Sequence, residues 1–187
     1  MPFIEVIDHQ EATGELKKIY DDLVQSRGKL AEVHKIQSLN PPTILAHMDL
    51  YIKIMFGKSP LRRHQREMLG VITSAVNKCE YCVHHHAEAL NHFWKDNEKI
   101  ELLIRDFRNA SLSGTDLLLC IMAEKLTQDP SFPGRESLLH SLREEGLSDR
   151  AILDATLVIA YFNFVNRIVL NLGVEFDVDE MKGYKYD

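Results

Sequence analysis

Apolar residues recur mostly at helical spacing along this chain, and strict alternation of apolar and polar residues is rare. In residues 11–25 the apolar side chains fall at i, i+3, i+4, i+7 and i+8. These positions are Leu16, Ile19, Tyr20, Leu23 and Val24. Gly28 follows the segment, as is typical after a helix C-terminus. The pattern predicts an all-α protein whose first helix packs one face on the core.

Proline and glycine divide the rest of the chain into further helical segments. Pro41 and Pro42 start a second helix that ends before Gly57. Its expected buried face is Ile44, Leu45, Met48, Tyr51, Ile52 and Met55. Residues 61–91 contain Gly70 but no proline, which predicts one long helix or two helices joined by a bend near Asn77. Further helices are predicted over residues 97–107, 113–127, 135–145 and 148–172.

Length and composition indicate one soluble globular domain. The 187 residues suffice for a sizeable core, and the 45% hydrophobic and 27% charged residues are ordinary for a folded protein. We expect a single domain over residues 1–187, with an N-terminal helical extension of about residues 1–57 and a C-terminal tail of about residues 174–187. The tail has no clear period, so we expect disorder there or docking on a neighbouring subunit.

Charge and hydropathy argue against several partners and locations. The net charge is −6 and Lys and Arg never run longer than a pair, so neither nucleic acid nor an anionic membrane surface is an expected partner. The first residues lack the cationic and apolar regions of a secretory signal. The apolar segment 151–172 contains Asp154, Asn163, Asn166 and Arg167, which indicates a buried core helix and no membrane span. We therefore expect a cytoplasmic protein.

Candidate chemistry concentrates in residues 77–88, NKCEYCVHHHAE. On a helix, Cys79 and Cys82 lie about 60° apart around the axis and Cys82 and His86 about 40° apart, so all three share one stripe. A disulfide needs Cβ atoms roughly 3.8 Å apart, which favours a first cysteine at a helix start, with Asn77 as the expected cap. Backbone N–H groups at such a start also favour thiolate over thiol. Cys120 lies in an apolar segment and is expected to be a buried packing residue.

A histidine one turn beyond Cys82 can take the proton from the thiol or stabilise the thiolate. Spacing does not choose between His85 and His86, although only His86 also lies seven residues beyond the first cysteine. A carboxylate on the other ring nitrogen would hold such a histidine in place. Glu67 and Glu88 are the nearby candidates for this carboxylate.

Together with residues 59–76, the motif resembles the alkylhydroperoxidase AhpD-like branch of the carboxymuconolactone decarboxylase superfamily, in particular its peroxidase-related members. The family pattern is a Glu, about a dozen residues, and then Cys-x-x-Cys-x-x-x-His. Glu67, Cys79, Cys82 and His86 match it in order and spacing. A weaker resemblance extends over most of the chain. It implies a single-domain helical bundle with a helix-borne Cys-x-x-Cys motif and assembly into homotrimers or hexamers.

The resemblance also implies a thiol-dependent peroxidase mechanism without cofactor or metal. Glu67 would orient His86, and His86 would activate Cys82 to attack hydrogen peroxide or an organic peroxide. Cys79 would resolve the sulfenic acid as a disulfide, which a dithiol partner protein would reduce. The best-known AhpD proteins have a histidine where this chain has Tyr81. A phenol cannot replace imidazole as a base near neutral pH, so a shorter proton relay is expected.

Alternatives to a peroxidase stay open at this point. The cysteine pair could report redox state in a non-catalytic sensing or binding module, or form a metal site with the histidines. Structural zinc usually takes two separated ligand pairs, and no second pair exists here. Lactone decarboxylation is the other superfamily chemistry, but those members generally lack the cysteine pair. At least one of His84 and His85 is expected to be only solvated or packed.

Overall fold

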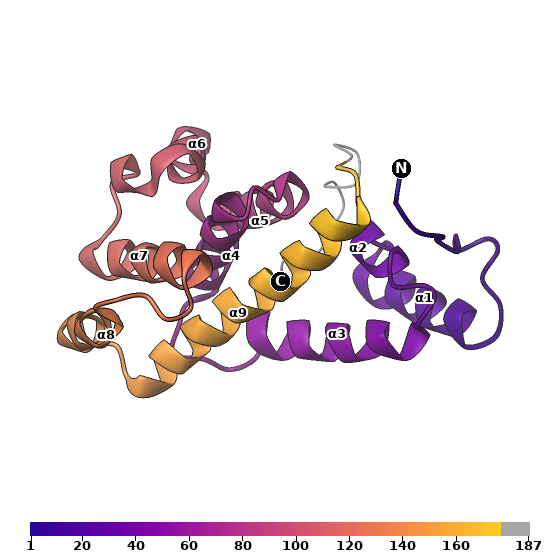
Figure 1. The fold of residues 1–187 in the computed structure, drawn as a ribbon, viewed down its shortest axis with the longest axis horizontal. Helices are drawn as coiled ribbons and strands as arrows, with labels where there is room; N and C mark the ends of the chain where they lie inside the picture. Colours follow the sequence, from indigo (N-terminus) through magenta and orange to yellow (C-terminus); the bar gives the residue numbers. More distant parts are fainter. Residues whose placement is uncertain (177–187) are drawn as a thin grey trace.

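Figure 1 shows the computed structural model, which describes residues 1–176 of the chain. Within these residues the chain forms nine α-helices, one 3₁₀ turn and no strand, which confirms the all-α class. The elements are α1 (Gly14–Arg27), α2 (Glu32–Lys35), α3 (Pro41–Met55), α4 (Arg63–Val76), α5 (Glu80–Trp94), α6 (Asn97–Asp106), η1 (Phe107–Asn109), α7 (Gly114–Gln128), α8 (Arg135–Glu144) and α9 (Asp149–Leu172).

The long helix α9 crosses the molecule between two groups of helices, with α1 to α3 at one side and α4 to α8 at the other (Figure 1). It begins where the Ser148 hydroxyl accepts the Ala151 N–H at 3.2 Å and ends at Gly173. By length and composition alone α9 could cross a membrane. Its residues Val158 and Ile159 are, however, fully buried among other helices. It is the core helix that the sequence predicted, while the cytoplasmic location stays a prediction.

Two apolar clusters hold the described residues together. The larger one joins α4 to α9, and the smaller one joins α1 and α3. Tyr51 of α3 packs against both clusters, so the two are continuous at this residue. The division into a domain, an N-terminal extension and a tail stays a prediction, and residues 177–187 of the predicted tail lie outside the described residues.

The buried face of α3 differs from the predicted one. Leu45 and Ile52 are 50% and 46% exposed, whereas His47 is only 4% exposed. The buried stripe therefore follows Ile44, His47 and Met48. A polar side chain can lie in this stripe because His47 hydrogen-bonds at both ring nitrogens.

Residues 61–91 form two helices, and the turn between them places the cysteines. Asn77 ends α4 and Cys79 is itself the N-cap of α5, so the predicted cap at Asn77 is wrong. Lys78 adopts φ 58° and the Cys79 N–H donates to the Ser74 carbonyl at 2.9 Å, which closes the turn. The Asn77 side chain instead donates to Asn166 of α9 at 2.9 Å. Asn77 is the C-cap residue of α4 and lies two residues before the N-cap of α5, so it is not in a position to cap α5.

Candidate active site

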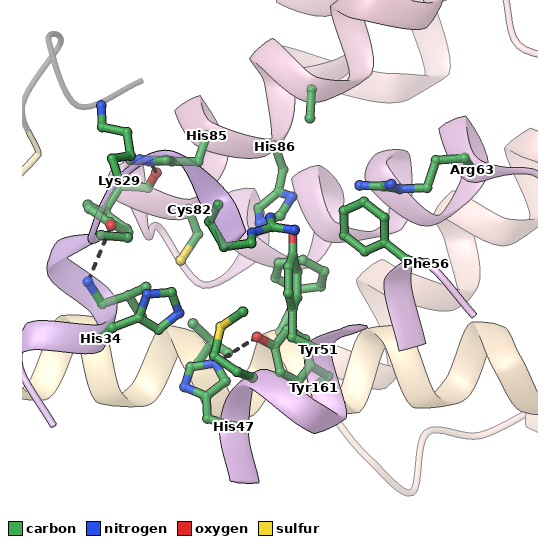
Figure 2. A pocket seen from close by; sticks show the side chains of 18 residues that line it. Lys29, His34, His47, Tyr51, Phe56, Arg63, Cys82, His85, His86 and Tyr161 are labelled. Atoms are coloured by element: carbon green, nitrogen blue, oxygen red, sulfur yellow. Dashed lines mark hydrogen bonds between the residues drawn. The ribbon is translucent and has the colours of Figure 1, made fainter. Parts of the chain in front are cut away.

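Helices α4 and α5 pack against each other and bring the four predicted site residues into one region. Glu67 lies in α4, Cys79 at the start of α5, Cys82 in its first turn and His86 one turn later. Figure 2 shows the Cys82 sulfur directed into the pocket, with His86 beside it.

The fully buried Glu67 carboxylate orients His86. His86 Nδ1 lies 2.6 Å from Glu67 Oε2, and Arg63 Nε donates to Glu67 Oε1 at 3.0 Å. An ionised carboxylate only accepts hydrogen bonds, so Nδ1 carries the hydrogen and Nε2 is left as the basic nitrogen. Burial would raise the pKa of Glu67, but His86 and Arg63 outweigh it and hold the pKa below its ordinary value. The other candidate, Glu88, is exposed on α5.

The His86 ring is held from the side by α9. Phe162 packs edge-on against it, with ring centroids 4.4 Å apart. A Cβ at Gly70 of α4 would lie 2.7 Å from the Phe162 ring, so only glycine lets this phenylalanine approach α4 so closely. Packing and the carboxylate together fix the direction of His86.

The two cysteines are free thiols that hydrogen-bond to each other. The thiol and the backbone N–H of Cys82 both hydrogen-bond to the sulfur of Cys79 and lower its pKa, although burial opposes this. The same thiol interaction, together with burial, raises the pKa of Cys82. The Asn166 side chain contributes a hydrogen bond to both sulfurs. Cys120 is buried as expected, and burial raises its pKa.

A pocket opens beside Cys82 between α9, α5 and the N-terminal helices (Figure 2). Its volume is about 90 Å³, several times the roughly 10–15 Å³ that a single water molecule requires. Cys82 and His86 line it, whereas Cys79 does not. The rest of the lining includes Tyr and Phe rings and aliphatic side chains as well as three basic residues. One of these, Arg63, has its guanidinium 3.6 Å from the centre of the Phe56 ring. The pocket therefore has room and apolar surface for a small organic molecule.

The remaining histidines of the motif have separate contacts. His85 Nδ1 lies 2.8 Å from the Tyr81 carbonyl oxygen, and the two rings pack with centroids 4.3 Å apart. The Tyr81 hydroxyl accepts the Val33 N–H at 3.3 Å, so it fastens the segment before α3 to α5. His84 is exposed and stacks on Phe176. Glu67 therefore pairs with His86 and with neither neighbour.

The described residues offer no obvious metal centre. Within residues 1–176, no three His, Cys, Asp or Glu side chains are grouped so that they could hold a metal ion. Cys79 and Cys82 lie together, but His86, the histidine beside Cys82, is hydrogen-bonded to Glu67 through Nδ1. The alternative of a metal site at this cluster therefore lacks a ligand set in the described part of the chain.

The sequence analysis did not identify Arg63 and Asn166, which lie outside the Cys-x-x-Cys motif. Arg63 lies four residues before Glu67 on the same helix, and this spacing for an ion pair could have indicated it. Asn166 stands in an apolar segment and is fully buried. A polar residue in a buried helix requires a partner, which could have indicated its position near the motif.

The fold and the site define the class as all-helical proteins with a dithiol beside a histidine and a buried carboxylate. The family model described as "Carboxymuconolactone decarboxylase family" matches residues 42–116. An uncharacterized peroxidase-related protein from Silicibacter sp. TM1040 is 26% identical, with a TM-score of 0.83 over 97% of this chain and 94% of that one. These matches support the resemblance to the carboxymuconolactone decarboxylase family over residues 42–116 and to a peroxidase-related protein over most of the chain.

Two further structures share the fold. The alkylhydroperoxidase AhpD core of a peroxidase-related protein from Ralstonia eutropha JMP134 has a TM-score of 0.85 and 20% identity, covering 98% of both chains. The debrominase Bmp8 has a TM-score of 0.77 and 16% identity, covering 96% of this chain and 98% of that one. At such identities these two structures show the fold alone.

Proposed function

We propose that this chain is a thiol-dependent peroxidase that reduces hydrogen peroxide or organic hydroperoxides through the Cys79 and Cys82 pair. The observation that carries the proposal is the position of Cys82. Its thiol lines an apolar pocket beside His86, whose Nδ1 is bonded to the buried Glu67. The likeness to a peroxidase-related protein supports the same chemistry.

In the proposed reaction His86 Nε2 takes one proton from the dithiol. The Cys82 thiolate attacks the terminal peroxide oxygen, an S–O bond forms and the O–O bond breaks. Two electrons pass from sulfur to the peroxide, and the leaving alkoxide takes the proton from His86. Cys82 is then a sulfenic acid. Cys79 attacks its sulfur, and water leaves as the disulfide forms.

The directions of the two thiol pKa values bear on the order of these steps. The proton that the pair retains is favoured on Cys82, because Cys79 accepts hydrogen bonds at the start of α5. Attack by Cys82 therefore requires this proton to move to Cys79. We propose Cys82 as the attacking residue because it lines the pocket and Cys79 does not.

The cycle closes when a second dithiol reduces the disulfide, and we propose a dithiol protein as this partner. We also propose that the chain forms a homo-oligomer, a trimer or hexamer. Exposed apolar side chains on α3 and α9 support this proposal because water would solvate them poorly. They include Leu45, Ile52, Leu153 and Leu157. Light scattering of the purified protein measures the subunit number.

Turnover with an excess of dithiothreitol tests the enzyme proposal. We expect continuous consumption of cumene hydroperoxide by the wild type and by Cys120→Ala, the matched cysteine control. Cys82→Ser should consume none. Oxidation that stops after one equivalent, with dithiothreitol and other dithiols present, would show a redox sensor and contradict a peroxidase.

The debrominase in the same fold provides a comparison substrate. A variant of Bmp8 has been solved with 2,3,4-tribromopyrrole. Bromide release from this compound, measured beside peroxide consumption under the same conditions, shows whether the pocket of this chain prefers a peroxide. We expect peroxide consumption to exceed bromide release, and the reverse result would replace the peroxidase proposal.

A further inference from the structure

A second hydrogen-bonded chain reaches the pocket from the side of α2 and α3. Gln37 Nε2 lies 2.8 Å from His47 Nδ1, and His47 Nε2 lies 2.6 Å from the Tyr161 hydroxyl oxygen. The last of these contacts is buried, and Figure 2 shows it as a dashed line. His47 and Tyr161 both line the pocket that contains Cys82.

The side chain of Gln37 determines which groups donate and which accept along this series of hydrogen bonds. Gln37 Nε2 also donates to the Val33 carbonyl oxygen at 2.7 Å, and a carbonyl only accepts, so the amide N–H₂ group must face this way. The second hydrogen of Nε2 then points to His47 Nδ1, which accepts it. Burial lowers the pKa of His47 from 6.5 to about 4, so the ring is neutral at pH 7. Its single hydrogen is therefore on Nε2 and is donated to the Tyr161 oxygen.

The hydroxyl hydrogen of Tyr161 is thus left over. Among the described residues, the series of hydrogen bonds from Gln37 through His47 ends at Tyr161. The Tyr161 hydroxyl oxygen already accepts the hydrogen of His47. Burial raises the pKa of Tyr161, with further contributions from Tyr51 and Cys82, so the phenol keeps its hydrogen at neutral pH. The hydrogen can turn toward the pocket, where Cys82 is the neighbouring reactive group.

We propose that Tyr161 donates a hydrogen bond to the leaving oxygen of the peroxide while Cys82 attacks, an inference that rests on the proposed peroxidase function. As the O–O bond breaks, the electron pair stays on this oxygen and negative charge develops there. A donor already fixed at that place stabilises the charge without reorganising. His86 supplies the proton that completes the alcohol, and Tyr161 keeps its own hydrogen.

The neighbouring residue on α9 supports this arrangement. Tyr161 and Phe162 are consecutive, and Phe162 packs against His86 while the Tyr161 ring lies with its centroid 5.3 Å from that of Phe162. Consecutive residues of α9 therefore hold the His86 ring and line the pocket that contains Cys82. In this arrangement His47 of α3 orients the Tyr161 hydroxyl by donating a hydrogen bond to it.

Tyr161→Phe removes only the hydroxyl and tests the proposal by the choice of oxidant. Tert-butyl hydroperoxide leaves as a strongly basic alkoxide, whereas peracetic acid leaves as a weakly basic carboxylate that needs little stabilisation. We expect the rate constant of Cys82 oxidation to fall about 10- to 100-fold with the hydroperoxide. With peracetic acid it should stay nearly unchanged. Alkylation of Cys82 by iodoacetamide, which has no leaving oxygen, should also be unchanged.

Two further variants separate this role from a structural one. Tyr20→Phe removes a buried hydroxyl that donates to the Ile7 carbonyl, away from the pocket, and should react like the wild type. Gln37→Leu keeps Tyr161 but no longer fixes the hydrogen of His47 on Nε2, so the Tyr161 hydroxyl can turn toward His47. We expect a smaller loss than in Tyr161→Phe, again confined to the hydroperoxide.

The outcomes distinguish the two proposals. A wild type that reacts with neither oxidant would overturn the peroxidase function together with the role of Tyr161. A reactive wild type whose Tyr161→Phe variant keeps its rate with tert-butyl hydroperoxide would overturn the role of Tyr161 alone. Equal losses with both oxidants, or slower alkylation, would also overturn it, because the hydroxyl would then act on the thiol or on the fold.

Discussion

Replacing Glu67 by glutamine should reverse the direction of the hydrogen bond to His86. Arg63 can only donate, so the amide oxygen of the new side chain must face Arg63, where Glu67 Oε1 now accepts at 3.0 Å. The amide N–H₂ then occupies the place of Oε2 and donates to His86 Nδ1. The ring hydrogen is forced onto Nε2, and this nitrogen can no longer accept a proton from the dithiol.

The expected size of the effect follows from two comparisons. A histidine held in the wrong tautomer costs a serine protease about 10⁴ in kcat. A cysteine forms some thiolate without a base, so we expect a smaller loss here, about 10²- to 10³-fold in the rate of Cys82 oxidation. Breaking a buried ion pair costs about 3–5 kcal/mol of stability, and we expect the low end because the amide oxygen still serves Arg63.

The pH dependence of stability gives an independent readout of the same change. The pKa of Glu67 lies below its ordinary value of 4.5, so its ionised form stabilises the native state above that pH. This stabilisation is lost as the pH falls through the native value. Glu67→Gln should therefore be less stable at neutral pH and lose less stability on acidification than the wild type.

Stopped-flow oxidation by cumene hydroperoxide, with urea unfolding of the same samples, measures both effects. Glu88→Gln makes the same substitution at an exposed position of α5 and should match the wild type in both assays. A folded Glu67→Gln protein that is oxidised at the wild-type rate would refute the reasoning about His86.

Three further changes have defined outcomes. Because burial lowers the pKa of His47 from 6.5 to about 4, the unfolded state binds more protons in this range, so stability should fall as the pH drops through it. The fall is about 3 kcal/mol, and urea unfolding of His47→Gln should not show it. Gly70→Ala places a Cβ 2.7 Å from the Phe162 ring, so thermal unfolding should show a loss of about 1–3 kcal/mol and His86 should activate Cys82 less. Cys120→Ala should leave peroxide oxidation unchanged and remove one thiol from the count in denaturant.

Local signals along the chain predicted most of the helices. Ser113 and Ser148 cap α7 and α9 at the predicted starts of these helices, and α9 ends at Gly173, directly after its predicted last residue. The first helix begins at Gly14, later than residue 11, where periodicity placed its start. The buried face of α3 was mispredicted because Leu45 and Ile52 are apolar but exposed. Helical periodicity indicates which residues share one face of a helix. It does not indicate which other helices pack against that face.

The candidate site was predictable because the spacing of its residues lies within two adjacent helices. Glu67, Cys82 and His86 are brought together by a single turn between α4 and α5. The surrounding residues Tyr161 and Phe162 were not predictable, because only the packing of α9 against α4 brings them near the motif. The expected position of the first cysteine at a helix start is confirmed, because Cys79 is the N-cap residue of α5. The cap predicted at Asn77 is wrong because this residue ends α4.

The central claim is that Cys82 attacks and Cys79 resolves. Thiol titration before and after one equivalent of cumene hydroperoxide, repeated on Cys79→Ser and Cys82→Ser, tests it most directly. We expect the loss of two thiols in the wild type and a trapped sulfenic acid in Cys79→Ser alone. No loss of thiols in the wild type, or a sulfenic acid trapped only in Cys82→Ser, would contradict it.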